Sequence, residues 1–171
     1  MRYIYANIIV NLHIPTNMHI IKAPESISKN FRTDKLIFLA GSIEMGLAED
    51  WQTHVANYFL HQSEYTLLNP RRDDWDSSWV QKIENPNFYQ QVNWELNGLE
   101  RADKIILYLS PETKSPISLL ELGLFAASGK LLVCCPSSFW RKGNVDIVCE
   151  RHRIPVYEKL DELLTFHFPK S

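Results

Sequence analysis

The sequence predicts an α/β domain, a three-layer sandwich in which a mainly parallel five-stranded sheet lies between two layers of helices. Short, almost wholly apolar runs alternate along the chain with longer segments of helical periodicity. Such runs are typical of parallel strands, because helices cover both faces of a parallel sheet. The regular alternation of strand and helix indicates one α/β unit.

The composition excludes several classes of protein. A chain of 171 residues with 45% hydrophobic and 22% charged residues is an ordinary globular protein, long enough for one sizeable core. The net charge of -2 argues against a protein that binds a nucleic-acid polymer, because such surfaces are usually basic. No stretch is long and apolar enough to span a bilayer, so we expect no membrane partner.

We divide the chain into an N-terminal extension packed on the domain, residues 1–35, and the main domain, residues 36–171. Residues 1–17 are compatible with an extension, an extra strand or an oligomer contact. The first fourteen residues are apolar-rich but contain two Asn and one His, which disfavours a secretion signal. Two of the three Cys lie together in an apolar run, so we expect buried, reduced thiols and a cytoplasmic protein.

Each element has a local sequence signal. The run Leu36–Ala40 is continuously apolar and ends at a glycine, as expected for a strand buried on both faces. Residues 154–157 contain a proline, which cannot donate a hydrogen bond to a neighbouring strand, so we expect this strand only at the edge of the sheet. Gly129 ends the third helix. The expected strands are 36–40, 65–68, 104–109, 131–135 and 154–157, and the expected helices are 48–62, 88–101, 115–127, 144–152 and 160–166.

The loops that follow the strands point to the ligand-binding edge. Residues 41–43, 69–72, 110–113 and 136–138 are small, polar or proline-rich, whereas the connections at the other ends of the strands are short. Ligands of parallel sheets bind outside the carboxyl ends of the strands. The loop from residue 69 to about 87 is long, and long loops are often functional.

Glu121 is the anomaly of the third helix. Ser115 is expected to cap this helix and Pro116 to occupy its first position. Nearly every later residue is apolar, which predicts a helix buried all round. A carboxylate in such a helix must be paired, protonated or open onto a cavity, because its desolvation costs several kcal/mol or more.

A second glutamate interrupts an apolar helical stripe. At 100° per residue, Phe88, Val92, Glu95 and Leu99 share one side of the preceding helix. Two inward carboxylates suit glycosidic chemistry, in which one attacks the anomeric carbon and the other handles the proton of the leaving group, at a separation of roughly 5 Å in retaining enzymes. The alternative is two unrelated ion pairs with nearby arginines.

Four segments carry a resemblance to the nucleoside 2-deoxyribosyltransferase family and its divergent branch. They are residues 38–43, 69–72, 94–103 and 115–123, of which the last is the most specific, and the similarity extends over about residues 36–164. The resemblance implies a flavodoxin-like (Rossmann-like) fold, a nucleoside or nucleotide as the small-molecule partner, and a homo-oligomer in which a neighbouring chain can complete the site.

The same resemblance assigns roles to residues. Glu121 takes the place of the nucleophile that forms a covalent deoxyribosyl-enzyme, and Glu95 that of the acid that handles the proton at the base. The remaining expected substrate-binding residues are Gly41, Ser42 and Ile43, Asn69, Arg71, Arg72, Trp75, Ser115 and Pro116.

Alternative interpretations apply to the other candidates. Arg71 or Arg72 could clamp a phosphate, or one of them could pair with Glu95, Asp73 or Asp74. Trp75 could wall a base pocket or simply pack against its neighbours. Asp103 begins a strand at the end away from the site, so we expect a structural role. The His residues show no metal-ligand spacing, so we predict neither a metal nor a cofactor.

We therefore expect a transferase or hydrolase acting on the N-glycosidic bond of a nucleoside or deoxynucleoside through a glycosyl-glutamate intermediate. One alternative is an N-glycosidase of nucleoside 5′-monophosphates, with the phosphate held by Ser42 and Arg71. The other is a nucleotide-binding or sensing module without turnover, because a fold alone does not specify function.

Overall fold

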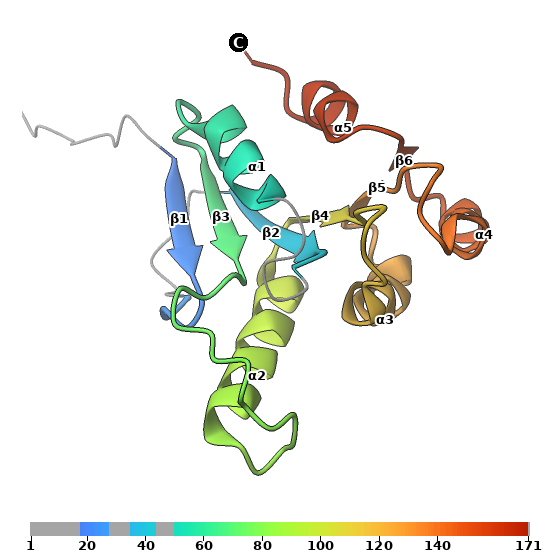
Figure 1. Ribbon diagram of the computed structural model, residues 1–171. Helices are drawn as coiled ribbons and strands as arrows, with labels where there is room; N and C mark the ends of the chain where they lie inside the picture. The colour runs from blue at the N-terminus through green and yellow to red at the C-terminus, as the bar shows by residue number, and fades with distance from the viewer. Residues whose placement is uncertain (1–17, 28–34, 44–49, 171) are drawn as a thin grey trace, which may run out of the picture.

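The computed structural model describes residues 18–27, 35–43 and 50–170, and these form three layers (Figure 1). A parallel sheet of six strands in the order β1-β3-β2-β4-β5-β6 forms the central layer. The α/β class, the parallel sheet and the helices on both faces are confirmed. The strands are β1 (His19–Lys22), β2 (Lys35–Gly41), β3 (Tyr65–Asn69), β4 (Lys104–Tyr108), β5 (Leu131–Cys134) and β6 (Val156–Tyr157).

The prediction of five strands was wrong, because the sheet continues into β1. This strand pairs in parallel with β3 at the edge of the sheet, with Ile21 opposite Leu68. It has four residues, and only its two central isoleucines are apolar, which is too little for a recognisable strand pattern. The open interpretations of residues 1–17 concern a segment outside the described residues.

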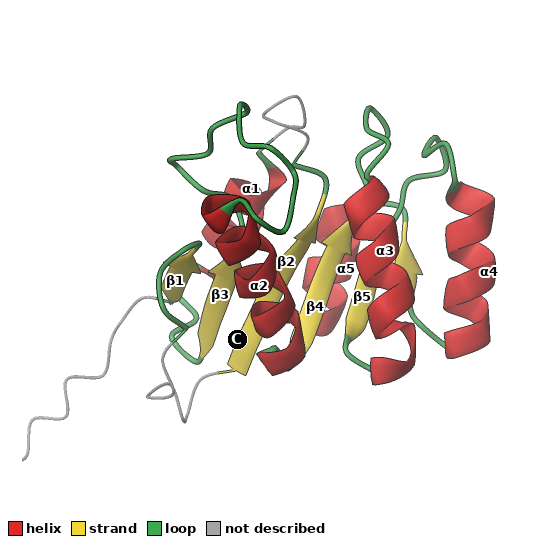
Figure 2. Ribbon diagram, turned by 90° about the horizontal axis from the view of Figure 1, so that it is seen from below, coloured by secondary structure: helices red, strands yellow, loops and turns green. Residues whose placement is uncertain are grey.

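The helices divide between the two faces of the sheet (Figure 2). Helices α1 (Trp51–Phe59) and α5 (Leu160–His167) cover one face. Helices α2 (Pro86–Arg101), α3 (Pro116–Phe125) and α4 (Lys142–His152) cover the other. A short 3₁₀ turn, Ala126–Ser128, extends α3 up to Gly129, whose positive φ of 71° ends the helix as expected.

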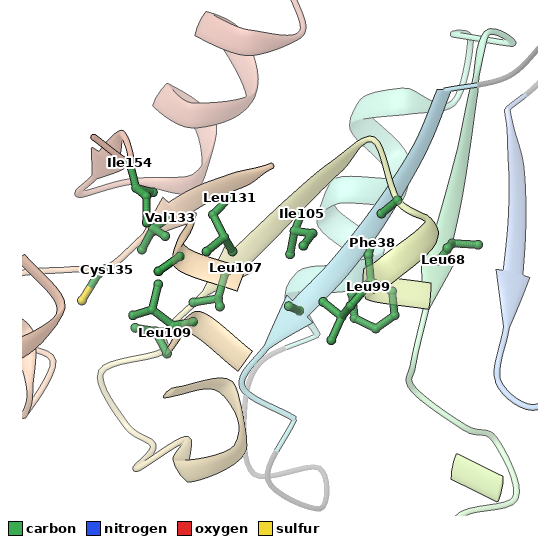
Figure 3. Close-up of a cluster of buried hydrophobic side chains, with 14 of the residues drawn as sticks. Phe38, Leu68, Leu99, Ile105, Leu107, Leu109, Leu131, Val133, Cys135 and Ile154 are labelled. Atoms are coloured by element: carbon green, nitrogen blue, oxygen red, sulfur yellow. The ribbon is translucent and has the colours of Figure 1, made fainter. Parts of the chain in front are cut away.

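Two hydrophobic clusters follow directly from the alternation of side chains along the strands. Phe38, Ile105 and Val133 point toward α2, α3 and α4, as part of the cluster in Figure 3. Their neighbours Ile37 and Ile106 point to the opposite face, toward α1 and α5. Strands buried on both faces explain why the apolar runs in the sequence are continuous.

The expectation that α3 is buried all round was wrong. Ile117, Leu120 and Leu124 are each about 60% exposed, while Leu122 and Glu121 are buried. The helix therefore packs one side on the sheet and presents an apolar stripe outward.

Two glycines allow neighbouring elements of the fold to approach each other closely. Helix α2 lies so near to β2 that a Cβ at Gly98 would come within 2.6 Å of the Phe38 ring. At the carboxyl end of β2, a Cβ at Gly41 would lie 2.2 Å from the carbonyl oxygen of Tyr108 on β4. Gly41 also has a φ of 142°, which side chains rarely permit. Only glycine allows β2 and β4 to meet in this way.

The opposite ends of the same two strands are tied by Asp103, whose carboxylate accepts a hydrogen bond of 2.8 Å from the Leu36 N–H. The expected structural role of Asp103 is confirmed. The three cysteines are buried and form no disulfide bond, and burial raises the pKa of Cys134 and Cys135 to about 12. In the part of the chain that the structure describes, no helix is long and apolar enough to cross a membrane.

Gly41→Ala is expected to lower the free energy of unfolding by about 3 kcal/mol or more, because the new Cβ would overlap the Tyr108 backbone. Gly123→Ala is the control: Gly123 is an exposed helical residue, and a Cβ added there would meet no atom within 4 Å, so alanine should stabilise by about 0.5–1 kcal/mol. Urea denaturation measures both. Equal stabilities of the two variants would contradict the close approach of β2 and β4.

Candidate active site

The polar loops after the strands gather at one edge of the sheet, because all six strands are parallel. The chain reverses its direction of winding between β2 and β4, which are adjacent although β3 separates them in sequence. Such a switch point is where ligands of open α/β sheets bind. The loops after β2 and β4, which contain Ser42 and Ser115, adjoin this point.

Three buried hydroxyl groups connect the two loops. Ser42 Oγ lies 2.5 Å from Ser115 Oγ, and Ser115 Oγ lies 2.7 Å from Thr113 Oγ1. The Ser110 N–H donates to Ser42 Oγ at 2.9 Å, and Thr113 donates to the Ser110 carbonyl at 3.0 Å. Ser42 Oγ also lies 2.8 Å from Thr113 Oγ1, so the three hydroxyls form a closed circuit in which each lies within hydrogen-bond distance of the other two.

The hydroxyl circuit changes the interpretation of Ser115. Its side chain makes no capping hydrogen bond to α3, so the predicted capping role was wrong. Its φ of 45° places it in the left-handed region, where its hydroxyl reaches the Ser42 loop. Pro116 begins α3 as predicted. The circuit thus fixes where α3 starts and so where its second turn, with Glu121, lies.

Glu121 and Glu95 both lie on the side of the sheet covered by α2 and α3. Glu121 is 8% exposed, and Glu95 lies at the margin of the buried stripe of α2, which consists of Gln91, Trp94, Gly98 and Leu99. Burial, and secondly the negative charge of Glu95, raises the pKa of Glu121 to about 8. The two carboxylates are therefore electrostatically coupled, as the sequence suggested.

The pKa values of the two glutamates are shifted unequally. Burial raises the pKa of Glu95, but a hydrogen bond from Gln91 opposes this rise. The charge that raises the pKa of Glu121 is that of ionised Glu95, so Glu95 loses its proton before Glu121 as the pH rises. With a pKa of about 8, Glu121 is mainly protonated at neutral pH. The residue expected to act as nucleophile thus carries the proton in the unliganded protein.

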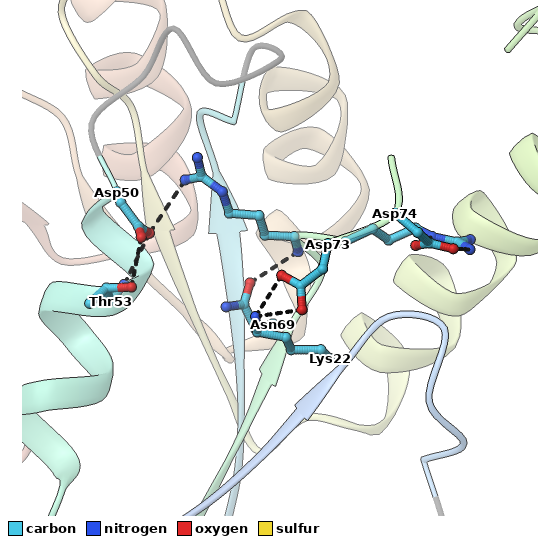
Figure 4. A network of polar contacts seen from close by, with 8 residues as sticks. Lys22, Asp50, Thr53, Asn69, Asp73 and Asp74 are labelled. Carbon is cyan, nitrogen blue, oxygen red and sulfur yellow. Dashed lines mark hydrogen bonds and ion pairs between the residues drawn. The ribbon is translucent and has the colours of Figure 1, made fainter. Parts of the chain in front are cut away.

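The arginines of the loop before α2 are paired with aspartates, and Figure 4 labels the acidic partners Asp50 and Asp74. Arg72 forms a two-point ion pair with Asp74, with both N–O distances at 2.8 Å, and stacks 4.9 Å from the Trp79 ring. The alternative in which one arginine pairs with Asp73 or Asp74 is confirmed for Arg72. Arg71 pairs with Asp50 at 3.3 Å, which the sequence did not indicate.

The other expected binding residues occupy the same edge. The Asn69 side chain accepts a hydrogen bond from the Arg71 N–H at 3.0 Å and so shapes the turn after β3. Ile43 follows Ser42 and is partly buried. Trp75 is 38% exposed, and its ring centroid lies 5.0 Å from that of Trp79, so Trp75 packs within its own loop.

A family comparison agrees with this arrangement. The sequence matches the model of a family described as nucleoside 2-deoxyribosyltransferase like over residues 34–139. The chain belongs to the nucleoside 2-deoxyribosyltransferase-like family. The matched region runs from the start of β2 to just beyond β5 and includes both glutamates. No curated protein matches the chain.

In this family member, sequence reasoning missed two buried amides. Gln91 Nε2 donates to the Pro70 carbonyl and to Glu95 Oε1, each at 2.8 Å, while its own oxygen has no partner among the described residues. Gln52 is fully buried on α1, and neither of its amide atoms has a partner in the described part of the chain. A polar residue one turn from a buried glutamate was the available signal for Gln91.

A separate hollow lies on the other face of the family domain. It has a volume of about 340 Å³ and includes neither glutamate. The lining residues of the hollow are Trp51, His54, Tyr108, Pro136, Glu158, Lys159, Leu160 and Asp161.

The part of the chain that the structure describes offers no cluster of metal ligands. Among residues 18–27, 35–43 and 50–170, no three His, Cys, Asp or Glu side chains cluster in a way that could hold a metal.

Glu121→Gln is expected to increase stability at high pH. The folded state raises the pKa of Glu121 from its usual 4.5 to about 8, so the native protein binds more protons than the unfolded chain between these values. Wild-type stability should therefore decrease as the pH rises from about 4.5 to 8, and the variant should escape this decrease. The melting temperature of the variant should exceed that of the wild type by several degrees at pH 8 and approach it at pH 4.5.

Glu112→Gln is the control for this experiment. Glu112 is exposed, so its variant should follow the wild-type melting temperature at every pH. A constant difference between Glu121→Gln and wild type across this range would contradict a shifted Glu121.

Proposed function

We propose that this protein cleaves the N-glycosidic bond of a nucleoside or deoxynucleoside through a glycosyl-glutamate intermediate. The observation that carries the proposal is the buried pair Glu95 and Glu121, in which burial and the charge of Glu95 raise the pKa of Glu121 to about 8. Retaining glycosidic chemistry needs one ionised and one protonated carboxyl group. Family membership makes a nucleoside the natural substrate class.

In the proposed mechanism the pair holds one proton, and this proton is sufficient for the first step. On substrate binding it passes from Glu121 to Glu95, which leaves Glu121 ionised. A Glu121 oxygen then forms a bond to C1′ while the C1′–N bond breaks, and Glu95 gives its proton to the departing base nitrogen. The base leaves neutral, and Glu95 becomes a carboxylate.

The second step regenerates the enzyme. The Glu95 carboxylate removes a proton from water or from the N–H of a second base, and the resulting nucleophile attacks C1′. The bond between C1′ and Glu121 breaks, and the proton is again shared by the pair. Water as acceptor makes the protein a hydrolase, and a base makes it a transferase.

The surrounding loops would position the sugar and base. The proposed contacts come from Gly41, Ser42 and Ile43 after β2, from Asn69, Arg71, Arg72 and Trp75 after β3, and from Ser115 and Pro116 before α3. The Ser42 and Ser115 hydroxyls are engaged in the circuit, and the Ser42 N–H donates to the Tyr108 carbonyl, so a substrate that binds these groups would compete with contacts inside the protein. A site of this kind supplies rate mainly by orienting C1′.

The 5′-monophosphate alternative would use Arg71. Its ion pair with Asp50 is long, at 3.3 Å, and its side chain is 29% exposed, so an entering phosphate could compete with the aspartate. A nucleotide-binding module without turnover is the remaining alternative.

Turnover is tested by chromatography of free base released from nucleosides, 2′-deoxynucleosides and their 5′-monophosphates, with and without a second base. Glu121→Gln should lower the rate by on the order of 10³-fold or more, and Glu95→Gln by about 10²–10⁴-fold. Glu100→Gln, on the exposed side of α2, is the matched control and should retain activity. Undiminished turnover in Glu121→Gln would contradict the proposal, and binding without any release would favour the sensing module.

We also propose that the protein is a homo-oligomer and that it resides in the cytoplasm, where its buried thiols stay reduced. The exposed apolar stripe of α3 supports self-association: Ile117, Leu120 and Leu124 lie three and four residues apart on one side of the helix.

Analytical ultracentrifugation tests the oligomer. The wild type should sediment as a multiple of the 20.0 kDa chain, and Ile117→Ser combined with Leu124→Ser should reduce its mass. Val80→Ser combined with Ile83→Ser is the control, since these apolar residues are also more than half exposed but lie in the loop before α2. A monomeric wild type would contradict the proposal.

A further inference from the structure

Gln91 is a buried amide held between two acceptors. It lies on α2 one turn before Glu95 and is 4% exposed. Residues four apart on a helix lie on the same side, so the Gln91 amide reaches the Glu95 carboxyl group. Its nitrogen is 2.8 Å from Glu95 Oε1 and 2.8 Å from the carbonyl oxygen of Pro70.

The Pro70 carbonyl decides how this amide is oriented. A carbonyl oxygen only accepts hydrogen bonds, so the atom of Gln91 that faces it must be the N–H donor. The amide has one nitrogen with two N–H groups, and the second N–H then faces Glu95. A reversed amide would place two oxygens against each other at Pro70 and is therefore excluded.

This orientation constrains the proton on Glu95. Because an N–H faces Glu95 Oε1, that oxygen must act as an acceptor, and any proton on Glu95 must be on its other oxygen. We propose that Gln91 is a positioning residue that keeps Glu95 ionised and so leaves the shared proton of the carboxylate pair on Glu121 in the unliganded protein. Burial raises the pKa of Glu95, and the hydrogen bond from Gln91 acts against this rise.

No described cation competes with Gln91 for this role. Glu121 on α3 is the charged group that interacts with Glu95. In the loop before α2, Arg71 and Arg72 are paired with Asp50 and Asp74. The sheet beneath α2 contributes apolar side chains such as Phe38, and the segment at residues 25–27 contributes the backbone carbonyls that accept from Trp94 and Arg101.

The consequence for turnover rests on the proposed function. In the second step Glu95 must accept a proton from water or a base, and the Gln91 N–H favours the ionised form that can do so. Loss of this hydrogen bond should move the pH at which Glu95 becomes a competent base upward by about one to two units.

The test compares Gln91→Met with Gln90→Met. Methionine keeps the length of glutamine but cannot donate, and Gln90 is an exposed neighbour on α2 that serves as the matched control. The ¹³Cδ resonances of Glu95 and Glu121 are titrated by NMR in the unliganded proteins. In Gln91→Met the Glu95 titration should shift upward by about one to two pH units and that of Glu121 downward, whereas Gln90→Met should resemble the wild type.

Two further outcomes keep the inference separate from the proposed function. The acid limb of the pH–rate profile should shift upward in Gln91→Met by the same amount as the Glu95 titration, which a merely structural role would not produce. If the protein shows no turnover, the NMR titration still decides the proton assignment. Unchanged glutamate titrations in a folded Gln91→Met protein would overturn the inference, and a shift without any wild-type turnover would overturn the proposed function alone.

Discussion

The close approach of β2 and β4 at their carboxyl ends is the constraint on which the site depends. Gly41 permits this approach, because any side chain there would collide with the Tyr108 backbone. The same approach brings Ser42 next to the loop after β4, where its hydroxyl joins those of Thr113 and Ser115. That circuit fixes the start of α3, and the start of α3 fixes the position of Glu121.

Burial of the Glu95 and Glu121 carboxyl groups costs free energy of folding, and this cost bears on the role of the pair. Burying two acids near one another disfavours ionisation of both, so the native protein retains a proton at pH values where the unfolded chain has lost it. A pair of this kind destabilises the fold at neutral pH. Perturbed acids at the switch point of a parallel sheet are what a catalytic site requires, which favours a functional over a structural role for the pair.

Sequence reasoning succeeded where a single helix or strand carries the signal. Apolar runs located the strands of the core, and acids on apolar helical surfaces located Glu95 and Glu121. It failed where the outcome depends on tertiary contacts. Strand β1 is too short for a pattern, and Ser115 bonds across the switch point instead of capping α3. The exposure of one side of α3 and the hydrogen bond from Gln91 to the Pro70 carbonyl likewise depend on tertiary neighbours that no local pattern reveals.

The central claim is that Glu121 forms a covalent bond to the sugar. Intact-protein mass spectrometry after rapid acid quenching of the protein with a nucleoside or deoxynucleoside substrate tests this most directly. We predict a mass increase of one glycosyl group that peptide mapping assigns to Glu121 and that is lost in Glu121→Ala. Turnover with no adduct at Glu121, or an adduct on another residue, would contradict the account.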